Sequence, residues 1–198
     1  VFETLQSELR ELEQETDSPD ALLKKLLGRA QDLSFEAGDE LLDAWDQAIL
    51  AVEQEQQRTE IFKNPEVLNY MAKLQQAAAA IKGKDGTPVV GKSNSLTDIV
   101  KTVHRALFEG NEDHFTVPDS AAAVAQCLIT FQSSHRPQDL WHFVTPDYRR
   151  TALWFQLHSG DNVDMVRVVD GVKEFMAENP PPAGITSDWF GLTYINVV

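Results

Sequence analysis

The sequence is poor in cysteine and in long apolar runs. The first shortage excludes a disulfide within the chain, and the second argues against a membrane-spanning segment. Its single cysteine, Cys127, lies inside the apolar run 121–129, so no disulfide can form within the chain. A thiol in such a run behaves as a small buried apolar group, whereas a catalytic thiol needs a base and an electropositive setting. No stretch of about 18 apolar residues occurs, so we expect no segment to span a bilayer.

Basic residues are also scarce. The chain of 198 residues has 17 Lys and Arg against 31 Asp and Glu, a net charge of −14. Proteins that bind nucleic acid neutralise phosphates with a basic surface, and proteins that bind anionic lipid surfaces recruit Lys and Arg in the same way. The charge therefore argues against nucleic acid and against an anionic membrane surface as partners.

The acidic residues are concentrated near the N-terminus. Residues 1–62 contain 16 acidic and 5 basic residues, whereas the rest of the chain has a net charge of only −3. Such an asymmetry indicates two parts of different surface character. We predict an acidic helical appendage or insertion at residues 1–61 and an α+β domain at residues 62–198.

Apolar spacing predicts helices through most of the chain. Residues 1–58 repeat apolar side chains at helical intervals, with Ser18-Pro19-Asp20 as a start signal inside them. Further helices are expected from Asn64-Pro65 to about residue 81, from about residue 96 to 107, from Asp119-Ser120 to about residue 131, and over 162–178.

Three segments have the pattern of strands. Val89-Val90 is a short candidate, and residues 149–159 alternate apolar and polar side chains. Residues 185–198 are rich in β-branched and aromatic residues. We predict that 149–159 and 185–198 are neighbouring strands of one sheet, with helix 162–178 packed across it as in a βαβ unit.

Signatures of catalysis and metal binding are missing from the sequence. It contains no H-E-x-x-H, no G-x-S-x-G, no phosphate-binding loop and no dinucleotide-binding glycine motif. Ser133-Ser134-His135 places a hydroxyl near an imidazole only in sequence, which does not orient a nucleophile on its base. We expect no enzymatic activity, no metal and no cofactor.

Aromatic residues gather in the C-terminal part of the chain. Large rigid rings of this kind either pack in a core or line a cleft for an apolar or amphiphilic ligand. Both interpretations stay open on the sequence alone. If a cleft exists, the residues expected to contact its ligand are Trp141, Phe143, Trp154 and Trp189.

Five stretches of the chain resemble one known family. They are 62–71 (FKNPEVLNYM), 90–104 (VGKSNSLTDIVKTVH), 118–120 (PDS), 143–149 (FVTPDYR) and 189–198 (WFGLTYINVV). In this order and spacing they are similar to the extracytoplasmic loop of MMPL-like exporters of the RND superfamily. The resemblance covers roughly two-thirds of the chain and includes no catalytic fingerprint.

The resemblance implies a fold, a function and a location. It implies a ferredoxin-like βαβ porter subdomain, with added N-terminal helices and a helical insertion, in a proton-driven membrane exporter. This subdomain would handle hydrophobic or lipid-like cargo on the periplasmic face of the inner membrane. Its partners would be the rest of the parent transporter, including the membrane helices and the second loop, and the parent could oligomerise. The chain would then be a fragment of a longer protein.

One departure from the family pattern concerns the first strand. A family loop has a strand just before the helix that begins at Pro65, whereas residues 48–61 are rich in Glu and Gln and helical in pattern. Either the first strand lies outside these residues or the acidic helices are an insertion, and the ferredoxin-like sheet would be incomplete. The alternative function is an extracytoplasmic scaffold that docks a partner through its acidic helices.

Overall fold

The computed structural model describes residues 1–16, 19–134 and 136–191. The chain divides into two compact units, Val1–Ile61 and Phe62–Val198. The first unit is helical in its described part, and the second combines helices with a sheet of two antiparallel strands. The expected α+β class is therefore confirmed.

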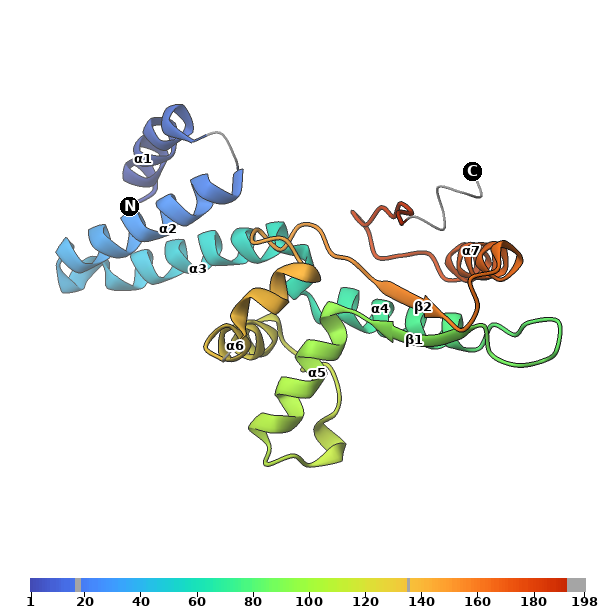
Figure 1. The fold of residues 1–198 in the computed structure, drawn as a ribbon. Coiled ribbons are helices and arrows are strands. Elements are labelled where there is room, and N and C mark those ends of the chain that lie inside the picture. The colour runs from blue at the N-terminus through green and yellow to red at the C-terminus, as the bar shows by residue number, and fades with distance from the viewer. Residues whose placement is uncertain (17–18, 135, 192–198) are drawn as a thin grey trace. The chain divides into compact units, whose positions relative to one another are not determined.

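The first unit contains three helices, α1 (Phe2–Glu15), α2 (Pro19–Glu36) and α3 (Leu42–Thr59), with a 3₁₀ turn at Asp39–Leu41. Helix α2 packs against both α1 and α3 (Figure 1). The guanidinium of Arg29 on α2 donates two hydrogen bonds to the Glu8 carboxylate on α1, the shorter of 2.9 Å. The predicted helical character of residues 1–58 is confirmed, although the predicted N-cap at Ser18 lies outside the described residues. The apolar side chains that become buried are Leu12, Leu26, Ala30 and Trp45.

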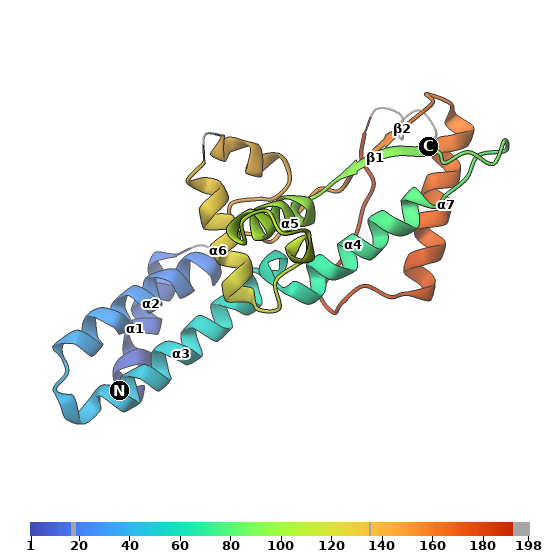
Figure 2. The same ribbon diagram turned by 90° about the horizontal axis from the view of Figure 1, so that it is seen from below.

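The second unit is built on two antiparallel strands that two helices cover on one face. Strand β1 (Val90–Asn94) pairs antiparallel with β2 (Trp154–Leu157), and helices α4 (Pro65–Ala79) and α7 (Asn162–Glu178) contact each other beside it (Figure 2). The inward side chains of the strands pack on those of the helices, which fixes the core on one face of the sheet. This core comprises Ala78, Val89, Val90, Val168 and Val172, with Phe155 and Leu157 packed against it.

The helix starts of the second unit follow the expected capping chemistry. The Asn64 side chain accepts a hydrogen bond from the Glu66 backbone N–H, with Pro65 in the first turn of α4. Helix α7 begins and ends at the predicted residues, and its N-cap is Asp161. The predicted helices that begin at Asn64-Pro65 and at residue 162 are therefore confirmed.

A helical insertion separates the two strands. It contains α5 (Leu96–Leu107) and α6 (Ala121–Gln132), which pack on each other, and short 3₁₀ turns at Glu112–His114 and Pro137–His142 (Figure 1). A capping box between Ser95 and Asp98 starts α5, and the Ser120 hydroxyl starts α6. The predicted helical insertion between the two strands is therefore confirmed, and the N-cap of α5 is Ser95.

The prediction of a strand over 149–159 is wrong in its extent. Strand β2 covers Trp154–Leu157 alone, and Thr151 makes one isolated bridge to Val144. Tyr148 has a φ of +52°, a left-handed conformation that reverses the chain just before the predicted strand. Arg149 and Arg150 therefore lie in a turn that the alternating pattern does not reveal.

The predicted pairing of this strand with residues 185–198 is not found in the described part of the chain. Residues 185–191 contain no strand, and the remainder of 185–198 lies outside the described residues. β-branched and aromatic composition favours a strand only where a partner can pair with it, and Gly184 and Gly191 have φ angles of +85° and +126° that strand backbone does not adopt. The partner of β2 is β1, in antiparallel register, so the βαβ arrangement across α7 is not the one observed.

Candidate functional site

Strand β2 has one face turned to the core and one turned to solvent. Phe155 and Leu157 are half-buried against the core, whereas Trp154 and Gln156 are exposed. This alternation is the usual consequence of pleating in a sheet covered on one side only. Because helices α4 and α7 pack on the core side, we refer to the opposite side as the open face of β2.

An aromatic pair lies at the start of the open face. The rings of Trp154 and Phe190 meet edge to face with centroids 5.1 Å apart, and they remain 46% and 58% exposed. The indole Nε1 of Trp154 donates a hydrogen bond of 3.4 Å to the backbone carbonyl of His142. Two large rings held in contact yet exposed to water offer a rigid apolar surface to a ligand or partner.

The four aromatic residues predicted to contact a ligand divide into two exposed and two half-buried positions. Trp154 belongs to the aromatic pair, and Trp141 is 42% exposed beside the ring of Tyr148. Phe143 is half-buried, and its carbonyl accepts hydrogen bonds from the Thr151 hydroxyl and the Ala152 N–H. Trp189 is half-buried against the core.

The hydrogen bond from Trp154 to the His142 carbonyl brings Trp154 close to the segment that carries Trp141. Trp189 instead packs against the core. Phe190, which joins Trp154, appeared in the sequence only as one of several aromatic residues in the C-terminal part. A strand pattern over 185–198 would place Trp189 and Phe190 on opposite faces, and the two side chains do differ in environment, with Phe190 exposed.

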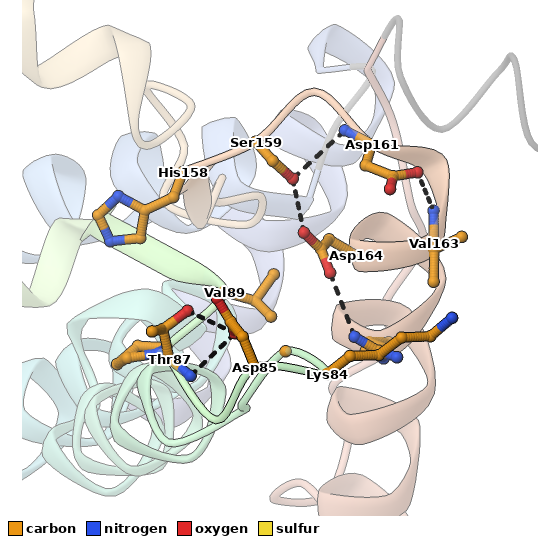
Figure 3. Close-up of a pocket in the computed structure, with 12 residues that line it drawn as sticks. Lys84, Asp85, Thr87, Val89, His158, Ser159, Asp161, Val163 and Asp164 are labelled. Atoms are coloured by element: carbon orange, nitrogen blue, oxygen red, sulfur yellow. Dashed lines mark hydrogen bonds and ion pairs between the residues drawn. The ribbon is translucent and has the colours of Figure 1, made fainter.

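A polar pocket lies where β2 leads into α7 (Figure 3). Its volume is about 380 Å³, which falls within the range of small-ligand sites. One wall is the turn that follows α4, and the other is the segment from His158 to the first two turns of α7. The residues that line it are Gly83, Lys84, Asp85, Thr87, Pro88, Val89, His158, Ser159, Asp161, Val163, Asp164 and Arg167.

The α7 wall of the pocket is organised around Asp164. Its carboxylate accepts a hydrogen bond of 2.6 Å from the Ser159 hydroxyl, and it forms an ion pair of 3.4 Å with Arg167 (Figure 3). Asp161 caps the helix by accepting from the Val163 backbone N–H at 3.0 Å. These bonds hold one side of the pocket in a fixed geometry.

The opposite wall is organised around Asp85. Its Oδ1 accepts hydrogen bonds from the backbone N–H and the hydroxyl of Thr87, at 3.0 and 2.8 Å. These two bonds lower the pKa of Asp85 below its ordinary value, and Arg167 across the pocket adds to the effect. The Asp85 carboxylate is therefore charged over the whole neutral range.

The remaining pocket residues show no arrangement for nucleophilic catalysis. The Ser159 hydroxyl is directed to the Asp164 carboxylate (Figure 3). The imidazole of His158 lies against Gly91. Burial raises the pKa of the Cys127 thiol, which keeps it protonated and unreactive. His135 of the Ser133-Ser134-His135 stretch lies outside the described residues.

A histidine stack in the helical insertion was not foreseen. The ring of His114 stacks on Phe108 with centroids 3.8 Å apart, and His104 meets both rings edge to face. His104 Nδ1 also lies 2.9 Å from the Thr116 carbonyl. The spacing of these residues in the sequence is irregular, so only the fold brings them together.

Within the described part of the chain, no group of three or more His, Cys, Asp or Glu residues could hold a metal ion. None of the helices in that part is both long and apolar enough to cross a bilayer.

No protein-family model, curated protein or solved structure matches this chain. Two surface features of the described residues bear on function. These are the aromatic pair beside strand β2 and the polar pocket between the turn after α4 and the start of α7.

Proposed function

We propose that this chain is an extracytoplasmic domain of a proton-driven exporter of the RND type, and that it contacts hydrophobic or amphiphilic cargo. The observation that carries the proposal is the aromatic pair, because Trp154 and Phe190 form an exposed apolar surface on the open face of β2. The five family-like stretches support it, since they include β1, most of α5 and the turn before β2.

The proposal also extends to the fold. Two antiparallel strands with two helices on one face form half of the two-layer arrangement expected of a porter subdomain. We propose that this unit belongs to a ferredoxin-like porter subdomain. The domain would then lie on the periplasmic face of the inner membrane, with the membrane helices and the second loop of the parent as its partners.

Transport physics sets the expected affinity. A porter domain releases its cargo in every cycle, so tight binding would stall transport. The isolated chain is expected to bind amphiphiles weakly and to hydrolyse none, since its Ser159 hydroxyl and Cys127 thiol are not activated as nucleophiles.

Titration of the chain with a fluorescent fatty acid, followed by tryptophan emission, tests this function. Weak saturable binding without turnover is the expected result. Nanomolar binding would indicate a carrier protein instead, and ester hydrolysis that is lost on substitution of one serine or histidine would indicate an enzyme.

A second candidate function is a scaffold that docks a partner through the acidic helices. The corner between α2 and α3 favours it, because Phe35 is 94% exposed and Leu41 and Leu42 are exposed as well. An apolar tip surrounded by acidic residues fits an apolar pocket with a basic rim. If docking is the function, Phe35→Ser should abolish the association of the parent protein with its partner, whereas Trp154→Ser should leave it intact.

A further inference from the structure

The corner between α2 and α3 combines exposed apolar side chains with an unbroken run of acidic charge. Phe35 is 94% exposed, and Leu41 and Leu42 are exposed where the 3₁₀ turn runs into α3. Residues 30–57 contain eight acidic residues and no Lys or Arg. We refer to residues 35–43 as the acidic tip. Its exposed acidic residues are Glu36, Asp39, Glu40 and Asp43.

The second unit carries a patch of the opposite charge around Tyr148. The ring of Trp141 meets the Tyr148 ring edge to face with centroids 6.4 Å apart, and Trp141 is 42% exposed. The ammonium group of Lys63 lies 4.2 Å from the centroid of the Tyr148 ring. Arg149 follows Tyr148 directly, and both Arg149 and Arg150 are exposed. We refer to these five residues as the basic patch.

The two arginines of the basic patch line a hollow of about 330 Å³ together with Thr145 and Asp147. The Asp147 carboxylate accepts hydrogen bonds from the Thr145 hydroxyl and the Arg149 backbone N–H, so its oxygens are used within its own turn. The Arg150 side chain forms no ion pair with any residue that the structure describes. Its guanidinium therefore retains its donors for a carboxylate from outside this turn.

The acidic tip and the basic patch match each other in two respects. Residues 120–160 contain three arginines and two aspartates, in a chain whose net charge is −14, so the patch can attract the carboxylates of the tip. The exposed phenyl ring of Phe35 can pack on the exposed indole of Trp141, as aromatic anchors do at the centre of interfaces. The same chain therefore carries both halves of a complementary contact.

We propose that two copies of this chain associate head to tail, with the acidic tip of one copy docked on the basic patch of the other. Phe35 packs against Trp141, and the carboxylates around it pair with Arg149 and Arg150. Because the two surfaces differ, the contact is heterologous, and repeated contacts close a ring or extend a chain of copies. This inference goes beyond cargo binding and does not depend on it, and it names a second copy as the partner for the second candidate function.

Sedimentation equilibrium of the full chain over a range of concentrations tests the association. The natural chain should associate reversibly. Association should weaken as the salt concentration rises from about 0.1 M to about 1 M, because the Debye length falls from about 10 Å to about 3 Å. A chain that stays monomeric at its highest soluble concentration would overturn the inference, and so would association that does not weaken with salt.

Two variants each remove one half of the contact. Phe35→Ser should weaken association about thirtyfold, as expected for the loss of a central aromatic anchor. Arg150→Glu should weaken it about five- to tenfold, since a repulsion replaces an attraction between exposed charges. The matched controls are Leu50→Ser, at a 53% exposed position of α3, and Lys173→Glu, at an exposed position of α7. Neither control should change association, and equal effects of a variant and its control would overturn the assignment.

A mixture of the two variants tests whether the tip and the patch meet each other. The Arg150→Glu chain retains an intact tip and the Phe35→Ser chain an intact patch, so the mixture should form a one-to-one dimer and no larger species. Such a dimer would also show that both variants are folded. A mixture that associates no better than either variant alone would overturn the head-to-tail contact. Both variants should bind the fluorescent fatty acid like the natural chain, so the cargo function and the self-association can fail separately.

Discussion

Gly171, in the middle of helix α7, lies directly against Ile81. A Cβ atom at Gly171 would lie 2.7 Å from Cδ1 of Ile81 and 3.1 Å from its Cγ1. The first distance is shorter than real Cβ contacts and the second is tighter than most of them, so the absence of a side chain at this position lets α7 approach the segment that follows α4. The helix that forms one wall of the polar pocket is positioned partly by this contact.

We predict that Gly171→Ala destabilises the chain, although alanine is the better helix former by about 1 kcal/mol. Overpacking typically costs about 1–3 kcal/mol and should outweigh that gain. Ile81→Val removes Cδ1, and in the double variant the cost of Gly171→Ala should fall. Urea unfolding of the four chains measures this coupling. Equal costs of Gly171→Ala in both backgrounds would contradict the close contact.

A second prediction concerns the start of α5. The Ser95 side chain is fully buried and donates to Gln75 Oε1 at 2.8 Å, while it accepts from the Thr97 N–H at 3.1 Å. Ser95→Ala leaves buried polar partners unsatisfied and should cost about 1–3 kcal/mol of unfolding free energy.

The matched control is Ser120→Ala, at the start of α6. There the hydroxyl is exposed and accepts one hydrogen bond of 3.2 Å, so the cost should be about 1 kcal/mol or less. If the two variants unfold at the same urea concentration, the buried hydrogen bonds of Ser95 contribute no more to the free energy of unfolding than an ordinary N-cap does.

A third prediction concerns pH. The Thr145 hydroxyl donates to the Asp147 carboxylate and, with the Arg149 N–H, lowers the pKa of Asp147 below its ordinary value. Thr145→Val should raise this pKa toward the ordinary value, as measured by NMR titration of the Asp147 carboxyl carbon. Because the pKa is lowered in the folded state, the stability that this carboxylate contributes is present above the unfolded-state pKa. It is lost as the pH falls through the folded-state pKa.

A fourth prediction concerns Cys127, which is 2% exposed on α6. Burial raises the pKa of its thiol, so both access and ionisation oppose modification in the folded state. A thiol reagent should label Cys127 only as fast as the surrounding structure opens, and the rate should rise steeply through the urea transition. Rapid labelling of the folded chain would show that α6 is not packed as described.

The sequence predicted helices much better than strands. Capping residues and apolar spacing are local signals, so Asn64-Pro65, Ser120 and the bounds of α7 could be located without the structure. Strand pairing depends on distant partners. The partner of Trp154–Leu157 is Val90–Asn94, which contains Gly91 and has little strand character of its own.

The candidate site was predicted only in part, for a similar reason. Trp154 and Trp141 could be named because aromatic residues cluster in the C-terminal part of the sequence. The polar pocket joins Asp85 to Asp164 across 79 positions of sequence, and none of its residues forms a recognisable motif. Its location depends on the close approach of α7 to the turn after α4, which local patterns do not encode.

In the proposed binding mode, an apolar chain lies against Trp154 on the open face of β2. The most direct test is quenching of tryptophan emission by a zwitterionic amphiphile with bromine atoms near the end of its alkyl chain. Quenching should be saturable in the natural chain and in Trp45→Phe, because Trp45 is buried in the N-terminal unit. It should be largely lost in Trp154→Phe, which retains an aromatic ring for binding but not the reporter. Undiminished quenching in Trp154→Phe would show that the alkyl chain does not bind against Trp154.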